Sequence, residues 1–165
     1  MKTLLILRHA KSSWDHPRLS DHDRPLNGRG NRDAPRMGRL LVDRDLVPER
    51  IVSSTAVRAR STAELAAAEF DREVEIETTR RLYLASPDSY VEVVETMGET
   101  AERLMVVGHN PGISALVMGL TGEVEFMPTA ALAVVDLDIG DWADLGSAER
   151  GRLIAFWRPK ALPRD

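Results

Sequence analysis

Short, mostly apolar runs alternate with longer segments of helical composition through most of this chain. The runs are 4–7, 51–53 and 104–107. Apolar runs of this length are typical of strands that are buried on both faces of a sheet. Parallel strands need a crossover connection between them, which is usually a helix. The order therefore predicts an α/β fold, a three-layer sandwich with a mostly parallel central sheet flanked by helices.

The segments between these runs carry the start signals of helices. We expect a helix within 28–46, where Pro35 should lie near the start or cause a bend. A second helix is expected over 56–70, capped by Ser54 or Thr55. Further helices are expected after Ser86-Pro87 and after Asn110-Pro111, because each pair resembles an N-cap followed by proline in the first turn.

The remaining segments predict strands and irregular structure. Residues 73–78 alternate like an edge strand, and 131–139 and 151–157 predict two more strands. No helical pattern separates the last two, so we expect them to form an antiparallel hairpin at the sheet edge. Residues 12–27 show no useful period and predict a loop, and 158–165 predicts a loosely held tail.

Length and composition exclude several classes of protein. The 165 residues suit a single domain over 1–165, and the net charge of −4 gives no sign of general binding to nucleic acid or to anionic membranes. There are no cysteines, which excludes disulfides, thiolate metal sites and a cysteine nucleophile. The first apolar run is too short for a signal sequence or a membrane span. We therefore expect a cytoplasmic protein, and a monomer, since nothing requires an oligomer.

Arginine and histidine residues follow the buried runs. Arg8 and His9 come directly after the first, Arg58 lies about one turn into the helix after the second, and His109 and Asn110 follow the third. Ligands of open α/β sheets bind at the carboxyl ends of the strands. The sequence therefore predicts that these side chains converge at one edge of the sheet.

This combination of side chains suits a phosphoryl group. Arginine pairs bidentately with phosphate oxygens, and a neutral imidazole can attack phosphorus and carry the group as phosphohistidine. A second histidine, protonated beside the phosphate, would stabilise the transition state, and amides at the helix start after Asn110 would favour an anion. Because side chains can supply all the positive charge, we expect neither a metal nor another cofactor.

Three motifs resemble those of a known family. They are "LRHAKS" at 7–12, "SSTAVRARSTAE" at 53–64 and "VVGHNPG" at 106–112. Their order and their residues resemble the histidine phosphatase superfamily, which is also called phosphoglycerate mutase-like. The short chain points to its SixA-like phosphohistidine phosphatase branch. The resemblance implies a phosphatase that acts on a phosphorylated protein or on a small phosphorylated substrate.

The resemblance also implies roles for individual residues. His9 would be the nucleophile, Arg8 and Arg58 would hold the phosphate oxygens, and His109 would be the second histidine of the phosphate pocket.

Further positions are expected to bind substrate less directly. Ser12 and Asp15 lie where relatives have polar residues near the phosphate, and Asn110 lies at the helix start. "DHDRPLNGRG" at 21–30 resembles a loop of the same branch. Its Arg24 could contact substrate or form a salt bridge that fixes the loop.

The sequence departs from the family pattern at three positions. Ala10 replaces a signature glycine, Lys11 replaces a common glutamate, and Leu84 lies where many members have the glutamate that protonates a departing alkoxide. Without that acid a phosphoester is a poor substrate, whereas the imidazole of a phosphohistidine can take its proton from solvent. A phosphoanhydride also leaves without much help, so another activated phosphoryl substrate is an alternative. An acid from Asp88 or Glu92 remains an alternative.

Other functions stay open at this point. The protein could be a phosphatase of small phosphoesters or nucleotide-type metabolites, or a phosphate-binding module without turnover. A metal hydrolase could use the loop residues His16, Asp21, His22 and Asp23, although their spacing is irregular. Trp14 is expected to pack over the edge of the core rather than to form a wall of the site.

Overall fold

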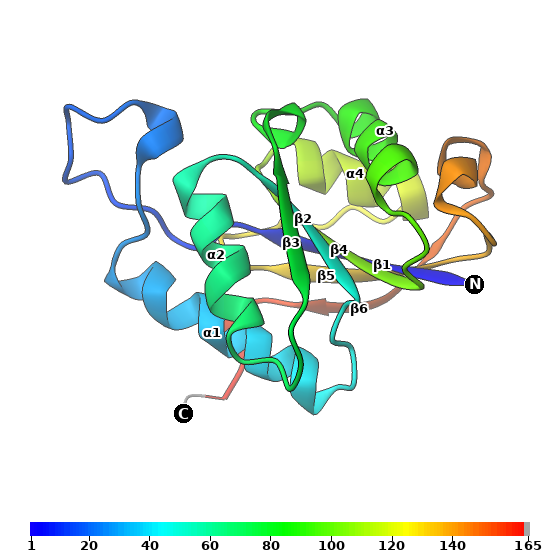
Figure 1. The fold of residues 1–165 in the computed structure, drawn as a ribbon, viewed down its shortest axis with the longest axis horizontal. Helices are drawn as coiled ribbons and strands as arrows, with labels where there is room; N and C mark the ends of the chain where they lie inside the picture. The colour runs from blue at the N-terminus through cyan, green and yellow to red at the C-terminus, as the bar shows by residue number, and fades with distance from the viewer. Residues whose placement is uncertain (164–165) are drawn as a thin grey trace.

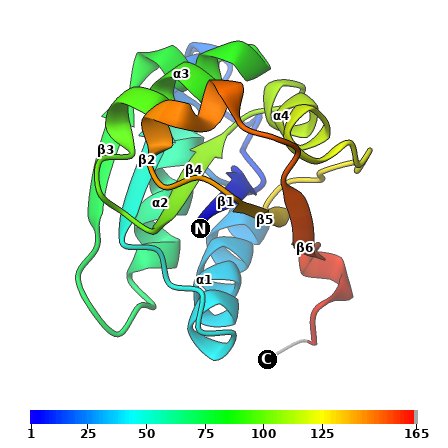
Figure 2. The same cartoon turned by 90° about the vertical axis from the view of Figure 1, so that its right-hand side faces the viewer.

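The computed structural model describes residues 1–163 and has an α/β fold, as predicted. Its six strands form one sheet in the order β3-β2-β4-β1-β5-β6. The strands are β1 (Lys2–Arg8), β2 (Arg50–Ser54), β3 (Glu75–Thr79), β4 (Arg103–Gly108), β5 (Leu132–Leu137) and β6 (Arg152–Trp157). The helices are α1 (Gly28–Asp43), α2 (Val57–Ala67), α3 (Pro87–Met97) and α4 (Gly112–Thr121). Helices cover both faces of the sheet (Figure 1), with α3 and α4 on one face and α1 and α2 on the other (Figure 2).

The sheet is parallel from β3 to β1 and antiparallel beyond β1. Strand β1 pairs in parallel with β4, and β2 pairs in parallel with both β4 and β3. Strands β5 and β6 form the predicted antiparallel hairpin. Strand β5 also pairs with β1, so β6 alone lies at that edge. Because β5 runs against both of its neighbours, the end of β6 lies at the same edge of the molecule as the end of β1.

The core consists of two layers, one on each face of the sheet. In β1, Leu4 and Ile6 belong to the layer beneath α3 and α4, whereas Leu5 and Leu7 belong to the layer beneath α1 and α2. All four side chains are fully buried, and each contributes roughly 1.5–3 kcal/mol to folding. Burial on both faces explains why this run is unbroken by polar residues.

The predicted N-cap is confirmed for α3 and wrong for α2. Ser86 caps α3, where its hydroxyl accepts a hydrogen bond from the backbone N–H of Ser89, and Pro87 occupies the first turn. In α2, however, the expected cap at Ser54 or Thr55 is wrong, because the N-cap position is Ala56. Strand β2 runs on to Ser54, and the side chain of this residue bonds the N–H of Ala56 at 3.1 Å instead.

Helix α1 begins with a side-chain cap and contains proline. The side chain of Asn27 accepts from the N–H of Gly30 at 2.9 Å, and Pro35 lies well inside the helix, past its first turn. The helix packs closely on α2 at Gly38. A Cβ at this position would lie 2.2 Å from the carbonyl oxygen of Ala66, so only glycine fits there. This contact positions α2, whose first turn carries Arg58.

The segment after β6 is held more firmly than predicted. It forms a 3-10 turn at Pro159–Ala161, and Arg36 of α1 donates hydrogen bonds to the carbonyl oxygens of Pro159, Leu162 and Pro163. These bonds contradict a loosely held tail up to Pro163. The last two positions of the predicted tail, 164–165, lie outside the described residues.

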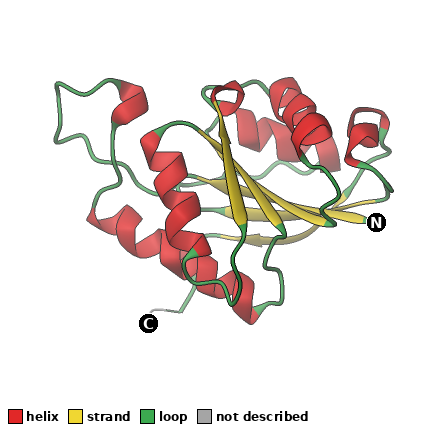
Figure 3. Ribbon diagram, viewed as in Figure 1, coloured by secondary structure: helices red, strands yellow, loops and turns green. Residues whose placement is uncertain are grey.

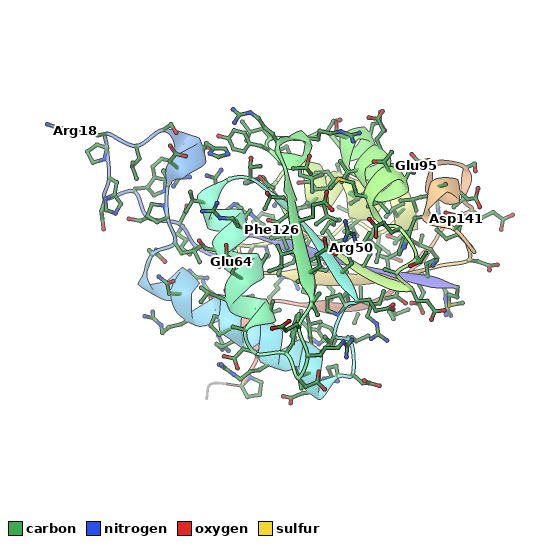
Figure 4. All side chains as sticks on the ribbon, viewed as in Figure 1. Arg18, Arg50, Glu64, Glu95, Phe126 and Asp141 are labelled. Atoms are coloured by element: carbon green, nitrogen blue, oxygen red, sulfur yellow. The ribbon has the colours of Figure 1, made fainter. Side chains whose placement is uncertain are left out.

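The loop between β1 and α1 extends beyond the body of the fold (Figure 3). Its outer tip carries Arg18, which points away from the sheet (Figure 4). The returning part forms a 3-10 turn at Asp21–Asp23 and approaches the first turn of α2. Within 1–163, no helix is long and apolar enough to cross a membrane.

Candidate active site

The carboxyl ends of β1, β4 and β2 bring two histidines together. Leu7 of β1 pairs with Val107 of β4, and Val107 pairs with Ser53 of β2. The residues that follow therefore emerge side by side. The ring centroids of His9 and His109 are 5.1 Å apart, and only 7% of His9 and 3% of His109 is exposed.

The hydrogen bonds of His9 define its tautomer. The ring Nδ1 lies 2.8 Å from the carbonyl oxygen of Ala10, and a carbonyl can only accept, so Nδ1 carries the proton. The other nitrogen, Nε2, then keeps its lone pair. The backbone N–H of Ala10 donates to the hydroxyl of Thr62 at 2.9 Å, which holds the backbone next to the ring. Ala10 is not among the residues with positive φ, so replacing the family glycine causes no backbone strain.

Both histidines are neutral in the protein alone. Burial, together with the nearby His109, Arg58 and Arg8, lowers the pKa of His9 from 6.5 to about 3. Burial and the charge of Arg58 lower the pKa of His109 to about 4. Neutral His9 is the form able to attack phosphorus. The expected cationic His109 requires the charge of a bound phosphate, which would raise its pKa.

Neighbouring hydroxyl groups position His109. Its Nε2 lies 2.8 Å from the hydroxyl of Ser54, and its backbone N–H donates to the hydroxyl of Tyr90 at 3.0 Å. Burial raises the pKa of Tyr90 to about 12, so this phenol stays protonated. A Cβ on Gly108 would lie 2.0 Å from the same hydroxyl, which explains why glycine precedes the histidine.

Arg58 is held by the loop that follows β1. Its Nη1 donates to the carbonyl oxygen of Asp21 at 2.7 Å, and its Nη2 donates to the carboxylate of Asp21 at 3.0 Å. The hydroxyl of Tyr83 donates to the same carboxylate at 2.6 Å. These bonds, from Tyr83 first and then Arg58, lower the pKa of Asp21 to about 2. Asp21 therefore stays ionised and serves as an anchor for Arg58.

Three buried nitrogens of the site have no hydrogen-bond partner among the described residues. They are Nε of Arg8, Nε of Arg58 and Nδ1 of His109. Arg8 uses Nη1 to donate to the carbonyl oxygen of Met127 at 3.1 Å. A buried polar group without a partner costs roughly 1–3 kcal/mol, so such groups call for a physical explanation. A bound anion that accepts hydrogen bonds from both arginines would explain the unpartnered nitrogens of Arg8 and Arg58.

Two of the four predicted substrate-binding residues, Ser12 and Arg24, bond each other within the loop after β1. Arg24 donates to the hydroxyl of Ser12 at 2.8 Å and to the carboxylate of Asp21 at 3.1 Å. Its guanidinium lies 3.6 Å from the ring centroid of Trp14. These contacts favour the loop-fixing role of Arg24. The packing role expected for Trp14 is wrong, because this side chain is 72% exposed and covers Arg24 rather than the core.

The other two predicted substrate-binding residues, Asn110 and Asp15, lie in different parts of the fold. Asn110 donates to the carbonyl oxygen of Met127 at 2.8 Å and accepts from the hydroxyl of Ser114 at 2.6 Å. The amide nitrogen thus holds the turn before α4 to the loop that also accepts from Arg8, and the amide oxygen holds this turn to the start of α4. The peptide bond between Asn110 and Pro111 is cis, and the assigned N-cap of α4 is Pro111. Asp15 is exposed on the loop after β1.

The position of the family glutamate carries a strained apolar residue. Leu84 is 67% exposed and has φ of +53°, in the left-handed region that non-glycine residues rarely adopt. Of the alternative acids, Glu92 pairs with Arg81 at 3.5 Å, and Asp88 is exposed in the first turn of α3. Neither carboxylate is oriented by a contact with the two histidines.

Three of the four loop residues considered for a metal are engaged in other contacts, and the fourth, His16, is exposed. The carboxylate of Asp21 accepts from Arg24, Arg58 and Tyr83. His22 bonds the carboxylate of Asp23 through Nδ1 and the hydroxyl of Thr55 through Nε2. Across 1–163, no group of three or more histidine, aspartate or glutamate side chains is arranged to hold a metal ion.

Comparisons with known proteins agree with this architecture. The histidine phosphatase superfamily (branch 1) matches residues 4–83. An uncharacterized protein of Mycobacterium leprae is 34% identical over 93% of this chain and 100% of its own length. The solved "putative phosphohistidine phosphatase SixA" of Agrobacterium tumefaciens is 33% identical with a TM-score of 0.82, covering 96% of this chain and 98% of its own. Its namesake from Nakamurella multipartitia is 27% identical with a TM-score of 0.86, covering 97% of each chain.

Fold and site together define a hydrolase of the phosphatase class. The chain belongs to the histidine phosphatase superfamily, in its SixA-like branch.

The buried neutral histidines make stability depend on pH. The pKa of His9 is about 3 in the folded protein against 6.5 for the free side chain. Between these values the unfolded chain binds a proton that the native state does not, so stability falls as the pH is lowered. At pH 5 the loss is about 2 kcal/mol. Replacing His9 with glutamine should remove this loss, and urea unfolding of both proteins at pH 7.5 and pH 5 measures it. An identical pH dependence of the two proteins would contradict the neutral buried state of His9.

Proposed function

We propose that this protein removes phosphate from phosphohistidine through a covalent phosphohistidine intermediate on His9. The observation that carries the proposal is the orientation of His9, whose Nδ1 donates to Ala10 and whose Nε2 keeps its lone pair beside two arginines and a second histidine. A residue that only bound phosphate would act as a donor, whereas a nucleophile needs this lone pair. The geometry therefore favours turnover over a binding module.

The proposed reaction has two displacement steps. In the first, Nε2 of His9 attacks phosphorus, the P–N bond of the substrate breaks, and the departing imidazole takes a proton from solvent. In the second, water attacks the phosphoryl group on His9, which releases inorganic phosphate and regenerates neutral His9. Arg8 and Arg58 neutralise the charge on the phosphoryl oxygens in both transition states.

The choice of phosphohistidine rests on the residue at the family's acid position. Leu84 cannot donate a proton, and the exposed Asp88 and Glu92 are not oriented towards the histidines. General acid catalysis contributes a factor of roughly 100–10,000, which a phosphoester with an alkoxide leaving group would lose. An imidazole leaves as a neutral ring once it is protonated, because its conjugate pKa is near 6.5. A phosphorylated imidazole therefore suits this site better than a sugar phosphate.

We expect kcat/KM for a phosphohistidine peptide to exceed that for a serine phosphoester of the same peptide by about 100-fold or more. Phosphate release from both peptides measures this preference directly. Leu84→Glu is the informative variant, because it restores the acid at the family position and should narrow the preference by raising ester hydrolysis. Ester hydrolysis equal to phosphohistidine hydrolysis in the unmodified protein would show that another group supplies the proton, and a small-molecule phosphatase would then be the better assignment.

A further inference from the structure

A groove of about 300 Å³ opens beside the candidate active site. Leu7 pairs with Leu132, and Leu132 pairs with Trp157. The residues after β1, those before β5 and those after β6 are therefore neighbours at the edge that carries His9. Arg8 belongs to both regions, because it lines the groove and its charge acts on both histidines.

The lining of this groove is strongly basic. It includes Arg8, Lys11, Arg29, Arg158 and Lys160, and none of the described residues that line it is acidic. We call this group of five residues the basic groove. Two of its cations have acidic partners outside the lining, since Arg29 bonds Asp33 and Arg158 bonds Glu125, whereas Lys11 and Lys160 are exposed. The whole chain carries a net charge of −4, so this concentration of positive charge is local.

The basic surface continues along α1. A second groove, of about 880 Å³, shares Arg29 and Lys160 with the first and adds Arg32, Arg36 and Arg39. Its one acidic lining residue, Asp33, is buried and pairs with Arg29 and Arg36. The surface therefore leads from the phosphoryl site along one helix, which suits an extended ligand better than a compact one. Such local fields attract oppositely charged partners and raise their association rates.

We propose that the basic groove binds an acidic segment of the phosphorylated substrate protein, with aspartate or glutamate side chains flanking the phosphohistidine. This inference rests on the proposed function and names its substrate class. Arg8 joins the two regions, so a carboxylate close to the phosphoryl group can reach Lys11 and Lys160 while the phosphate lies between the arginines. The second groove gives the following residues of the segment further cationic contacts on α1.

The test compares two phosphohistidine peptides that differ only in their flanks, one with four glutamates and one with four glutamines. We expect the acidic peptide to have about a tenfold higher kcat/KM, and higher salt to reduce this ratio. Lys11→Glu combined with Lys160→Glu should bring the ratio to about one or below. The control is Arg152→Glu, which changes an exposed arginine at the opposite end of β6 from Arg158 and should keep the tenfold ratio.

The remaining outcomes separate failure of the groove assignment from failure of the proposed function. Equal turnover of both peptides by the unmodified protein overturns the groove assignment and leaves phosphohistidine hydrolysis in place. Hydrolysis of a phosphoester without hydrolysis of either peptide overturns the proposed function, and this inference with it. A third outcome is that the protein prefers a small bisphosphate over its monophosphate, that the lysine variants abolish this preference, and that the two peptides are turned over equally. The groove would then bind a second phosphate, and the polypeptide assignment would be wrong.

Discussion

Replacing His9 with alanine is expected to abolish turnover and leave the fold intact. The imidazole Nε2 is the group that forms the covalent intermediate proposed here, and loss of a nucleophile reduces kcat by roughly 10,000-fold or more. The side chain follows the end of β1 and lies beside His109 at the edge of the sheet, so its removal should leave the two hydrophobic layers in place. Phosphate release under saturating phosphohistidine peptide, together with thermal unfolding, measures both parts of the prediction.

The intermediate itself gives a second readout for the His9 variant. Brief incubation with radiolabelled phosphohistidine peptide and acid-free quenching should label the unmodified protein, and the label should be lost in acid. His9→Ala should remain unlabelled, whereas His16→Ala, which changes an exposed histidine of the neighbouring loop, should label normally. Labelling of His9→Ala would assign the nucleophile to another residue, with the second histidine, His109, the first to test.

The fold was predictable because its buried strands and helix starts have clear local sequence patterns. Residues 4–7 and 104–107 are apolar without interruption, since both faces of β1 and β4 are buried. The pair Ser86-Pro87 starts α3 through contacts within one turn. The convergence of Arg8, His9 and His109 followed from one rule, that parallel strands end at the same edge. Each of these features depends on neighbouring residues or on strand direction alone.

The residues that the sequence did not reveal act over long separations. Asp21 contacts Arg58 across 37 positions and Tyr83 across 62, and no local pattern links a loop aspartate to a helix arginine. Sequence reasoning grouped Asp21 with other loop residues because they are close in sequence. Its partners Arg58 and Tyr83, however, lie on α2 and in the segment after β3. Trp14 was also misplaced, because its exposed ring stacks on the guanidinium of Arg24, ten positions later. The motif at 21–30 indicated only that Arg24 could form a salt bridge that fixes the loop.

Arg58 has two roles that a single substitution would remove together, because it lies at the phosphoryl site and also bonds Asp21 of the loop. We expect Arg58→Ala to lower kcat/KM by about 100- to 1,000-fold, because it removes a preorganised donor from the transition state. The same substitution also releases the loop at Asp21, so a lower rate alone would not separate charge stabilisation from loop position.

Two further variants separate these effects. Asp21→Ala releases the loop and leaves the guanidinium, whereas Arg58→Lys keeps a positive charge and loses the bidentate fork. If Arg58 acts on the phosphoryl group, Arg58→Ala should lose far more activity than Asp21→Ala, and Arg58→Lys should fall between them. Equal losses in Arg58→Ala and Asp21→Ala would mean that the arginine acts by holding the loop. Arg8 would then be the arginine that stabilises the phosphoryl oxygens, and the basic groove, which shares Arg8, would be the main source of attraction for an anionic substrate.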